Sequence, residues 1–197
     1  MKSAIRAAIA GSAVSREVNL VAVSKARSVD EIRAAFHAGQ RDFGENYVQE
    51  ALPKLEALAG LRREGLVWHF LGPIQSNKAG DVAAGFDWAH GVDREKIAEA
   101  LSRRRSGPPL NVCIEVNVSG EPGKHGVTPS QVRPLAQAVA RLPNLKLRGL
   151  MTLIEQTGDE AEQRRQFRRL REQFDLLRAE GMAVDTLSMG MSGDFPA

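Results

Sequence analysis

Seven short apolar runs, separated by longer stretches with helical periodicity, are the feature that most constrains the fold of this chain. They lie at residues 20–24, 42–44, 67–72, 88–92, 112–118, 147–153 and 186–190. Strands that alternate with helices form a parallel sheet, because each parallel connection needs a long crossover. The runs are rich in Val, Ile and Leu without strict alternation, which indicates strands covered on both faces.

Start and stop signals mark the helical stretches between the runs. Ser28 and Glu31 have the spacing of a capping box, and Asp93 is expected to cap the helix that runs towards residue 105. The remaining signals are a second capping box at Thr128 and Gln131 and stop signals at Gly39, Gly60 and Gly181. One further helix is expected before the first run.

The order of elements allows an open doubly wound sheet or a closed barrel. No glycine-rich dinucleotide fingerprint follows any strand, and seven strand–helix units favour the barrel. We therefore predict an α/β fold, a (β/α)8 TIM barrel whose eighth strand is missing from these 197 residues. No composition shift or linker divides the chain, so residues 1–197 are expected to form a single domain.

Composition excludes several classes of protein. The only cysteine, Cys113, lies within an apolar run, which predicts a buried thiol and excludes an internal disulfide. The four histidines are scattered without metal-ligand spacing. No apolar run reaches 18 residues, and residues 1–13 lack the apolar core of a secretion signal, so a cytoplasmic protein is expected.

The net charge of +3 is too small to demand a nucleic acid partner. Arginines of the segment near residue 165 are interleaved with Glu160 and Glu162, which favours a solvated helix face over RNA binding. The chain has one Tyr and two Trp, so no ladder of stacking aromatics accompanies the basic residues.

Lys25 follows directly on the first apolar run, where a buried strand would present its amine at the mouth of a barrel. Apolar walls there could lower the pKa of the amine, and a neutral amine can form a Schiff base with an aldehyde. The alternative is a solvated lysine in a strand-to-helix loop. Position alone leaves both interpretations open.

Other polar residues fall at the ends of later runs. Asn46 could donate to an anion or cap the next helix, and the stretch from Ser188 to Gly190 could hold a phosphate through small side chains and backbone amides. His69 and His90 could be core histidines, and Glu115 an interior carboxyl group. No nucleophile elbow or phosphate-binding P-loop motif is present.

Five motifs in order resemble the pyridoxal phosphate homeostasis protein family, also called the YggS or PROSC family. They are AVSK at 22–25, FGENYVQE at 43–50, WHFLGPIQSNK at 68–78, RGLM at 148–151 and LSMGMSGD at 187–194. The resemblance implies the barrel of the alanine racemase N-terminal domain, with pyridoxal 5′-phosphate (PLP) held as a Schiff base on Lys25. It places Asn46 and Ser188 near the phosphate. Further cofactor neighbours are expected at His69, Met151 and Ser192.

The resemblance also implies a role in intracellular PLP homeostasis without established turnover. The alternative is a PLP-dependent amino-acid racemase, which needs acid and base groups on opposite faces of the substrate carbon. The only tyrosine is Tyr47, inside a barrel motif, and no second domain supplies another. The expected partners are PLP and PLP-dependent apoenzymes, with no nucleic acid, no membrane and a monomeric state.

Overall fold

A computed structural model describes residues 18–155 and 157–194, together with residues 3, 5, 7 and 10, which are helical. The leading helix expected from the sequence otherwise lies outside the described residues. No helix in the described part of the chain is both long and apolar enough to span a membrane.

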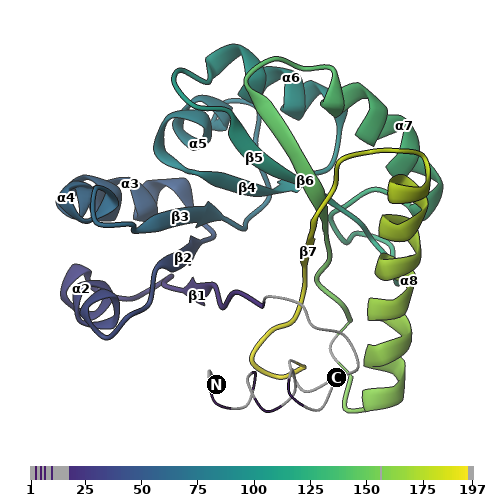
Figure 1. The fold of residues 1–197 in the computed structure, drawn as a ribbon, viewed down its shortest axis with the longest axis horizontal. Helices are drawn as coiled ribbons and strands as arrows, with labels where there is room; N and C mark the ends of the chain where they lie inside the picture. Colours follow the sequence, from purple (N-terminus) through teal and green to yellow (C-terminus); the bar gives the residue numbers. More distant parts are fainter. Residues whose placement is uncertain are drawn as a thin grey trace.

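Seven parallel strands form one curled sheet in the order of the sequence (Figure 1). The strands are β1 (Ala22–Val23), β2 (Asp42–Glu45), β3 (Val67–Phe70), β4 (Trp88–Val92), β5 (Leu110–Glu115), β6 (Leu145–Met151) and β7 (Thr186–Ser188). Each strand pairs only with its sequence neighbours, so within the described ranges β1 and β7 are the two edges. The predicted parallel sheet is confirmed, as an open half-barrel.

The helices lie on the outer side of the curled sheet, so its concave face is left for the interior (Figure 1). They are α2 (Val29–His37), α3 (Val48–Ala57), α4 (Ala59–Arg62), α5 (Ala79–Gly85), α6 (Glu95–Arg104), α7 (Pro129–Ala140) and α8 (Glu160–Ala179). On α8, Arg164 pairs with Glu160 at 2.6 Å and Arg165 with Glu162 at 2.7 Å. The predicted salt-bridged face of this helix is confirmed.

Most helix signals are confirmed. The Ser28 amide donates to Glu31 Oε2 at 2.8 Å, and the Glu31 amide donates to Ser28 Oγ at 3.2 Å. Gly39 and Gly181 follow the ends of α2 and α8 with φ of 92° and 82°, a backbone conformation that favours glycine.

Two helix signals were wrong. Gly60 lies inside α4 and does not end a helix, because α3 stops earlier and a short second helix follows at once. Asp93 does not cap α6: its carboxylate pairs with Arg94, which takes the N-cap position without a side-chain cap. The fifth and sixth strands also begin earlier than expected, at Leu110 and Leu145.

Alternation along β3 shows how the core and the interior are separated. Trp68 and Phe70 are buried towards the helices, where Phe70 meets Phe86 edge to face at 5.2 Å. His69 lies between them and therefore points to the opposite, interior face. Cys113 is fully buried, as predicted, and burial raises the pKa of its thiol to about 12.

Candidate functional site

The candidate site lies at the carboxyl edge of the sheet, where the strands of a parallel barrel deliver their functional groups. Lys25 follows β1, Asn46 follows β2, and Ser188 ends β7 opposite Met151 of β6. Lys25 therefore follows one edge strand of the sheet, and Ser188 ends the other.

Lys25 sits in a tight turn held by backbone hydrogen bonds. The Ser24 amide donates to Gly44 O at 2.8 Å, which joins the turn to β2, and the Arg27 amide donates to Ser24 O at 3.0 Å. Ala26 has φ of 58°, in the left-handed region that few non-glycine residues adopt. The Lys25 side chain is exposed, so the apolar enclosure expected from the sequence is not found.

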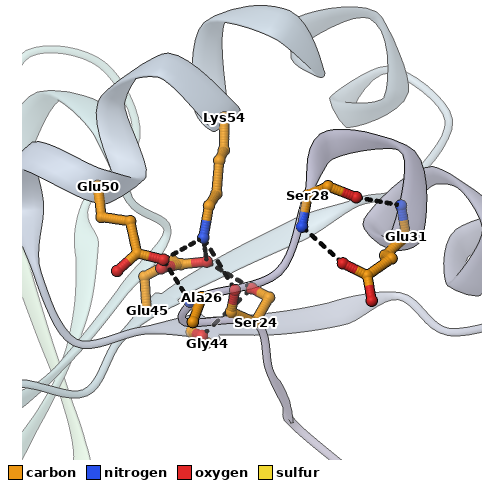
Figure 2. Close-up of polar contacts among 8 residues, drawn as sticks. All are labelled: Ser24, Ala26, Ser28, Glu31, Gly44, Glu45, Glu50 and Lys54. Atoms are coloured by element: carbon orange, nitrogen blue, oxygen red, sulfur yellow. Dashed lines mark hydrogen bonds and ion pairs between the residues drawn. The ribbon is translucent and has the colours of Figure 1, made fainter.

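A buried ionic network lies directly beneath this turn (Figure 2). Lys54 Nζ on α3 donates to Ser24 O at 2.8 Å, to Glu45 Oε1 at 2.9 Å and to Glu50 Oε1 at 2.7 Å. Ser24 Oγ donates to Glu45 Oε1 at 2.6 Å, and the Ala26 amide donates to Glu50 Oε1. We call Ser24, Glu45, Glu50 and Lys54 the lysine network; it holds the backbone on both sides of Lys25.

The lysine network pairs one cation with two carboxylates. Burial acts to lower the pKa of Lys54, but its bonds to Glu50 and Glu45 outweigh burial and raise that pKa. The hydrogen bond from Lys54 and, after it, the hydrogen bond from the Ala26 amide lower the pKa of Glu50. Lys54 is therefore held as a cation, and its amine lacks the free lone pair that attack on an aldehyde requires.

Sequence reasoning missed Lys54. Its spacing of four residues from Glu50 on a helix is a usable signal for an ion pair. The burial of this pair depends on Glu45 of β2, which no local pattern reveals.

A second polar network crosses the concave face of the sheet. His69 Nε2 lies 3.0 Å from Asp42 Oδ1, His69 Nδ1 lies 2.9 Å from His90 Nε2, and His90 Nδ1 lies 2.7 Å from Ser188 Oγ. We call Asp42, His69, His90 and Ser188 the histidine relay. Both histidines are buried, so their interpretation as hydrogen-bonded interior residues is confirmed.

The ring of Trp88 lies beside the relay. It stacks on His69 with ring centroids 5.5 Å apart, and the Arg148 guanidinium lies 4.7 Å from the Trp88 centroid. Arg148 also donates to Asp185 at 2.8 Å and to Asn111 Oδ1 at 3.0 Å. The charge of Arg148 is therefore balanced by the carboxylate of Asp185.

The remaining predicted residues differ in their surroundings. Asn46 does not cap α3, since Tyr47 takes that position. The Oδ1 atom of Asn46 is buried without a hydrogen-bond partner. Met151 is buried next to Ser188, whereas Ser192 is exposed in the turn that Asp194 closes onto the Met191 amide. The structure thus links Ser188 to His69 through His90, and it leaves the side-chain oxygen of Asn46 without a hydrogen-bond partner.

Glu115, at the carboxyl end of β5, is a buried carboxyl group. Burial, followed by the charge of Asp93, raises its pKa to about 7. It forms no side-chain hydrogen bond across the interior among the described residues.

Backbone packing fixes the rim between β2 and β4. A Cβ atom on Gly72 would lie 2.1 Å from the backbone oxygen of Asn46, and one on Gly91 would lie 2.6 Å from the backbone oxygen of Gly72. The loops after β2 and β3 and strand β4 therefore touch main chain to main chain, with no room for a side chain between them.

The comparisons with known proteins point to one family. The alanine racemase N-terminal domain model matches residues 5–197. The pyridoxal phosphate homeostasis protein of Pseudomonas aeruginosa PAO1 is 54% identical over 182 residues, covering 91% of this chain and 76% of its own. The protein of the same name from Escherichia coli K12 is 46% identical over 186 residues, covering 92% of this chain and 78% of its own.

Solved structures show the same fold. PipY of Synechococcus elongatus PCC7942, solved with PLP bound and without it, has a TM-score of 0.83 and 38% identity, covering 98% of this chain and 91% of its own. An alanine racemase of Clostridium difficile 630 has a TM-score of 0.68 at 13% identity, covering 95% of this chain and 50% of its own. The second similarity concerns the fold alone.

Proposed function

This chain belongs to the pyridoxal phosphate homeostasis protein family, and from that premise we propose that it binds PLP at the carboxyl edge of its curled sheet. The support is the 38% identical PipY, which was solved with PLP bound and covers nearly this whole chain. The buried, partnerless amide oxygen of Asn46 at the same edge fits a ligand, because a buried polar atom without a partner is costly.

We assign the covalent contact to Lys25. Its amine is exposed at the end of β1, and the lysine network fixes the turn that carries it. Condensation of this amine with the PLP aldehyde forms one C=N bond and releases the aldehyde oxygen as water. Lys54 is held as a buried cation by two carboxylates, whereas the side chain of Lys25 is exposed, and this contrast is the observation that carries the assignment.

The other site residues would surround the cofactor. In this proposal Asn46 and Ser188 would contact the phosphate, Met151 and His69 would line the interior, and Ser192 would contribute from the exposed turn beyond β7. When bound, PLP would supply a reversible aldehyde and an electron-accepting ring. The residues of this chain would hold and orient it.

The proposed role is PLP supply and storage rather than turnover. A racemase needs a second proton-transfer group opposite its lysine, and the single tyrosine of the sequence, Tyr47, is 62% exposed at the N-cap of α3. Delivery to PLP-dependent apoenzymes, a monomeric state and action in the cytoplasm remain predictions.

Borohydride trapping tests the assignment of Lys25. Wild-type protein mixed with PLP should develop an imine absorption band in the visible and carry the reduced label on Lys25 by peptide mass spectrometry. Lys25→Ala should lose the band, whereas Lys124→Ala, which removes a loop lysine paired with Glu121, should keep it. A label on another residue in wild-type protein would refute the assignment.

A racemisation assay tests the absence of turnover. Purified protein loaded with PLP should leave the chirality of alanine unchanged over a period in which an alanine racemase equilibrates it. Sustained conversion that is lost in Lys25→Ala would favour the enzyme instead.

A further inference from the structure

With both rings neutral, the carboxylate of Asp42 at one end of the histidine relay sets the direction of every hydrogen bond in it. A carboxylate only accepts, so a neutral His69 that donates from Nε2 to Asp42 accepts at Nδ1. His90 then donates from Nε2 to His69, and its Nδ1 accepts from Ser188 Oγ. The single proton of Ser188 is therefore used inside the sheet.

This proton order requires His90 to be neutral. Burial is the main cause that lowers the pKa of His90, to about 3. A neutral ring donates from one nitrogen and accepts at the other, so His90 can reverse its direction only by exchanging both roles together.

The order conflicts with an anion beside Ser188. With its proton donated to His90, Ser188 Oγ has only lone pairs for a ligand, and these repel phosphate oxygens. If the hydroxyl simply turned to the anion, it would leave the buried Nδ1 of His90 without a partner, which costs about 1 to 3 kcal/mol.

We propose, building on the proposed PLP site, that the histidine relay rests in this order with His69 neutral, and that binding of an anion at Ser188 reverses it and takes up one proton from solvent. The proton enters at Ser188 Oγ, the hydroxyl proton passes to Nδ1 of His90, and the Nε2 proton of His90 passes to Nδ1 of His69. Ser188 then donates to the anion, His90 stays neutral, and His69 carries the added charge.

The groups packed around the relay favour this arrangement. Asp42 on β2 faces His69 directly and would form an ion pair with it once it is protonated. Arg148 on β6 is separated from His69 by the ring of Trp88 and is paired with Asp185. Glu115 on β5 lies towards Gly91 and Asp93 at the rim. His69 is thus the relay histidine with a carboxylate partner.

Asp42→Asn tests the order without any ligand. The amide nitrogen of asparagine can donate to His69 Nε2, which turns both rings to the Nδ1–H form and frees the Ser188 hydroxyl. Nitrogen-15 NMR should show Nε2–H rings in the wild type and Nδ1–H rings in the variant. An Nδ1–H form of His90 in the wild type would overturn the proposal, whether or not the variant folds.

Calorimetry with sulfate tests the coupling, because sulfate takes up no proton near neutral pH. Measured in two buffers of different ionisation enthalpy, wild-type protein should take up about one proton per bound sulfate. Asp42→Asn should take up none and bind sulfate about tenfold more tightly, since its hydroxyl is already free to donate to a charged group.

Asp93→Asn is the matched control, because it removes a carboxylate near the same edge and leaves the relay intact. It should keep the uptake of one proton, which separates reversal of the relay from a simple change in charge. Sulfate binding without proton uptake in the wild type, or no sulfate binding to either protein, would overturn the coupling. Failure of PLP to label Lys25 would refute the proposed function and leave these results unaffected.

Discussion

The lysine network and the histidine relay are both buried polar networks, yet they compensate charge in different ways. In the lysine network the cation of Lys54 is paired with two carboxylates, those of Glu45 and Glu50. In the histidine relay one carboxylate stands at the end of a line of two imidazole rings and a hydroxyl group, each of which can both donate and accept a hydrogen bond. The first network suits a fixed backbone, and the second suits a response to a ligand.

Substitution of the central cation should produce the largest effect. Lys54→Met keeps most of the side-chain volume but leaves the fully buried carboxylate of Glu45 without its cation. Loss of one partner from a buried pair costs about 3 to 5 kcal/mol of unfolding free energy. Urea denaturation measures this loss. Lys124→Met, at a partly exposed loop pair, is the control and should cost less than about 1 kcal/mol.

The pH dependence of stability should show that His90 is buried in its neutral form. The pKa of His90 falls from 6.5 to about 3 on folding, so its contribution is complete above pH 6.5 and is lost as pH falls towards 3. By pH 5 this amounts to about 2 kcal/mol, at about 1.4 kcal/mol per pH unit. Wild-type protein should therefore lose stability in this window more steeply than His90→Phe. Equal slopes would contradict the difference between the networks.

The smallest effect is expected at the exposed side of the lysine network. The Glu50 side chain is 34% exposed, and a glutamine oxygen can still accept from Lys54 and the Ala26 amide. Glu50→Gln should therefore cost only about 0.5 to 1 kcal/mol and leave the Lys25 turn in place. Thermal unfolding and PLP labelling of Lys25 measure both. A cost as large as that of Lys54→Met would show that Glu50, rather than Glu45, is the critical carboxylate.

The sequence predicted the elements better than the contacts between them. Hydrophobic periodicity and the Ser28 capping box are local patterns, and they located strands and a helix start correctly. The Asp93 cap failed because a neighbouring arginine competes for its carboxylate. Lys25, Asn46 and Ser188 could be named because they follow strands, and their roles remain predictions.

The contacts of the two networks could not be predicted from the sequence, because they depend on which residues face each other across the sheet. His90 and Ser188 are 98 positions apart, and they meet only after the sheet has curled. Lys54 is nine positions from Glu45, but its burial follows from the packing of α3 against β2. Periodicity predicts that such a residue is inside, not which partner it finds there.

The contact of Asn46, Gly72 and Gly91 through their main chains makes one side of the mouth stiff. A side chain can rotate away from an incoming molecule, but three touching backbones can only move together with their strands. Around Gly193, in the turn after β7, an added Cβ atom would meet nothing within 4 Å. Space at the carboxyl edge is therefore closed by main chain between β2 and β4 and unfilled at Gly193.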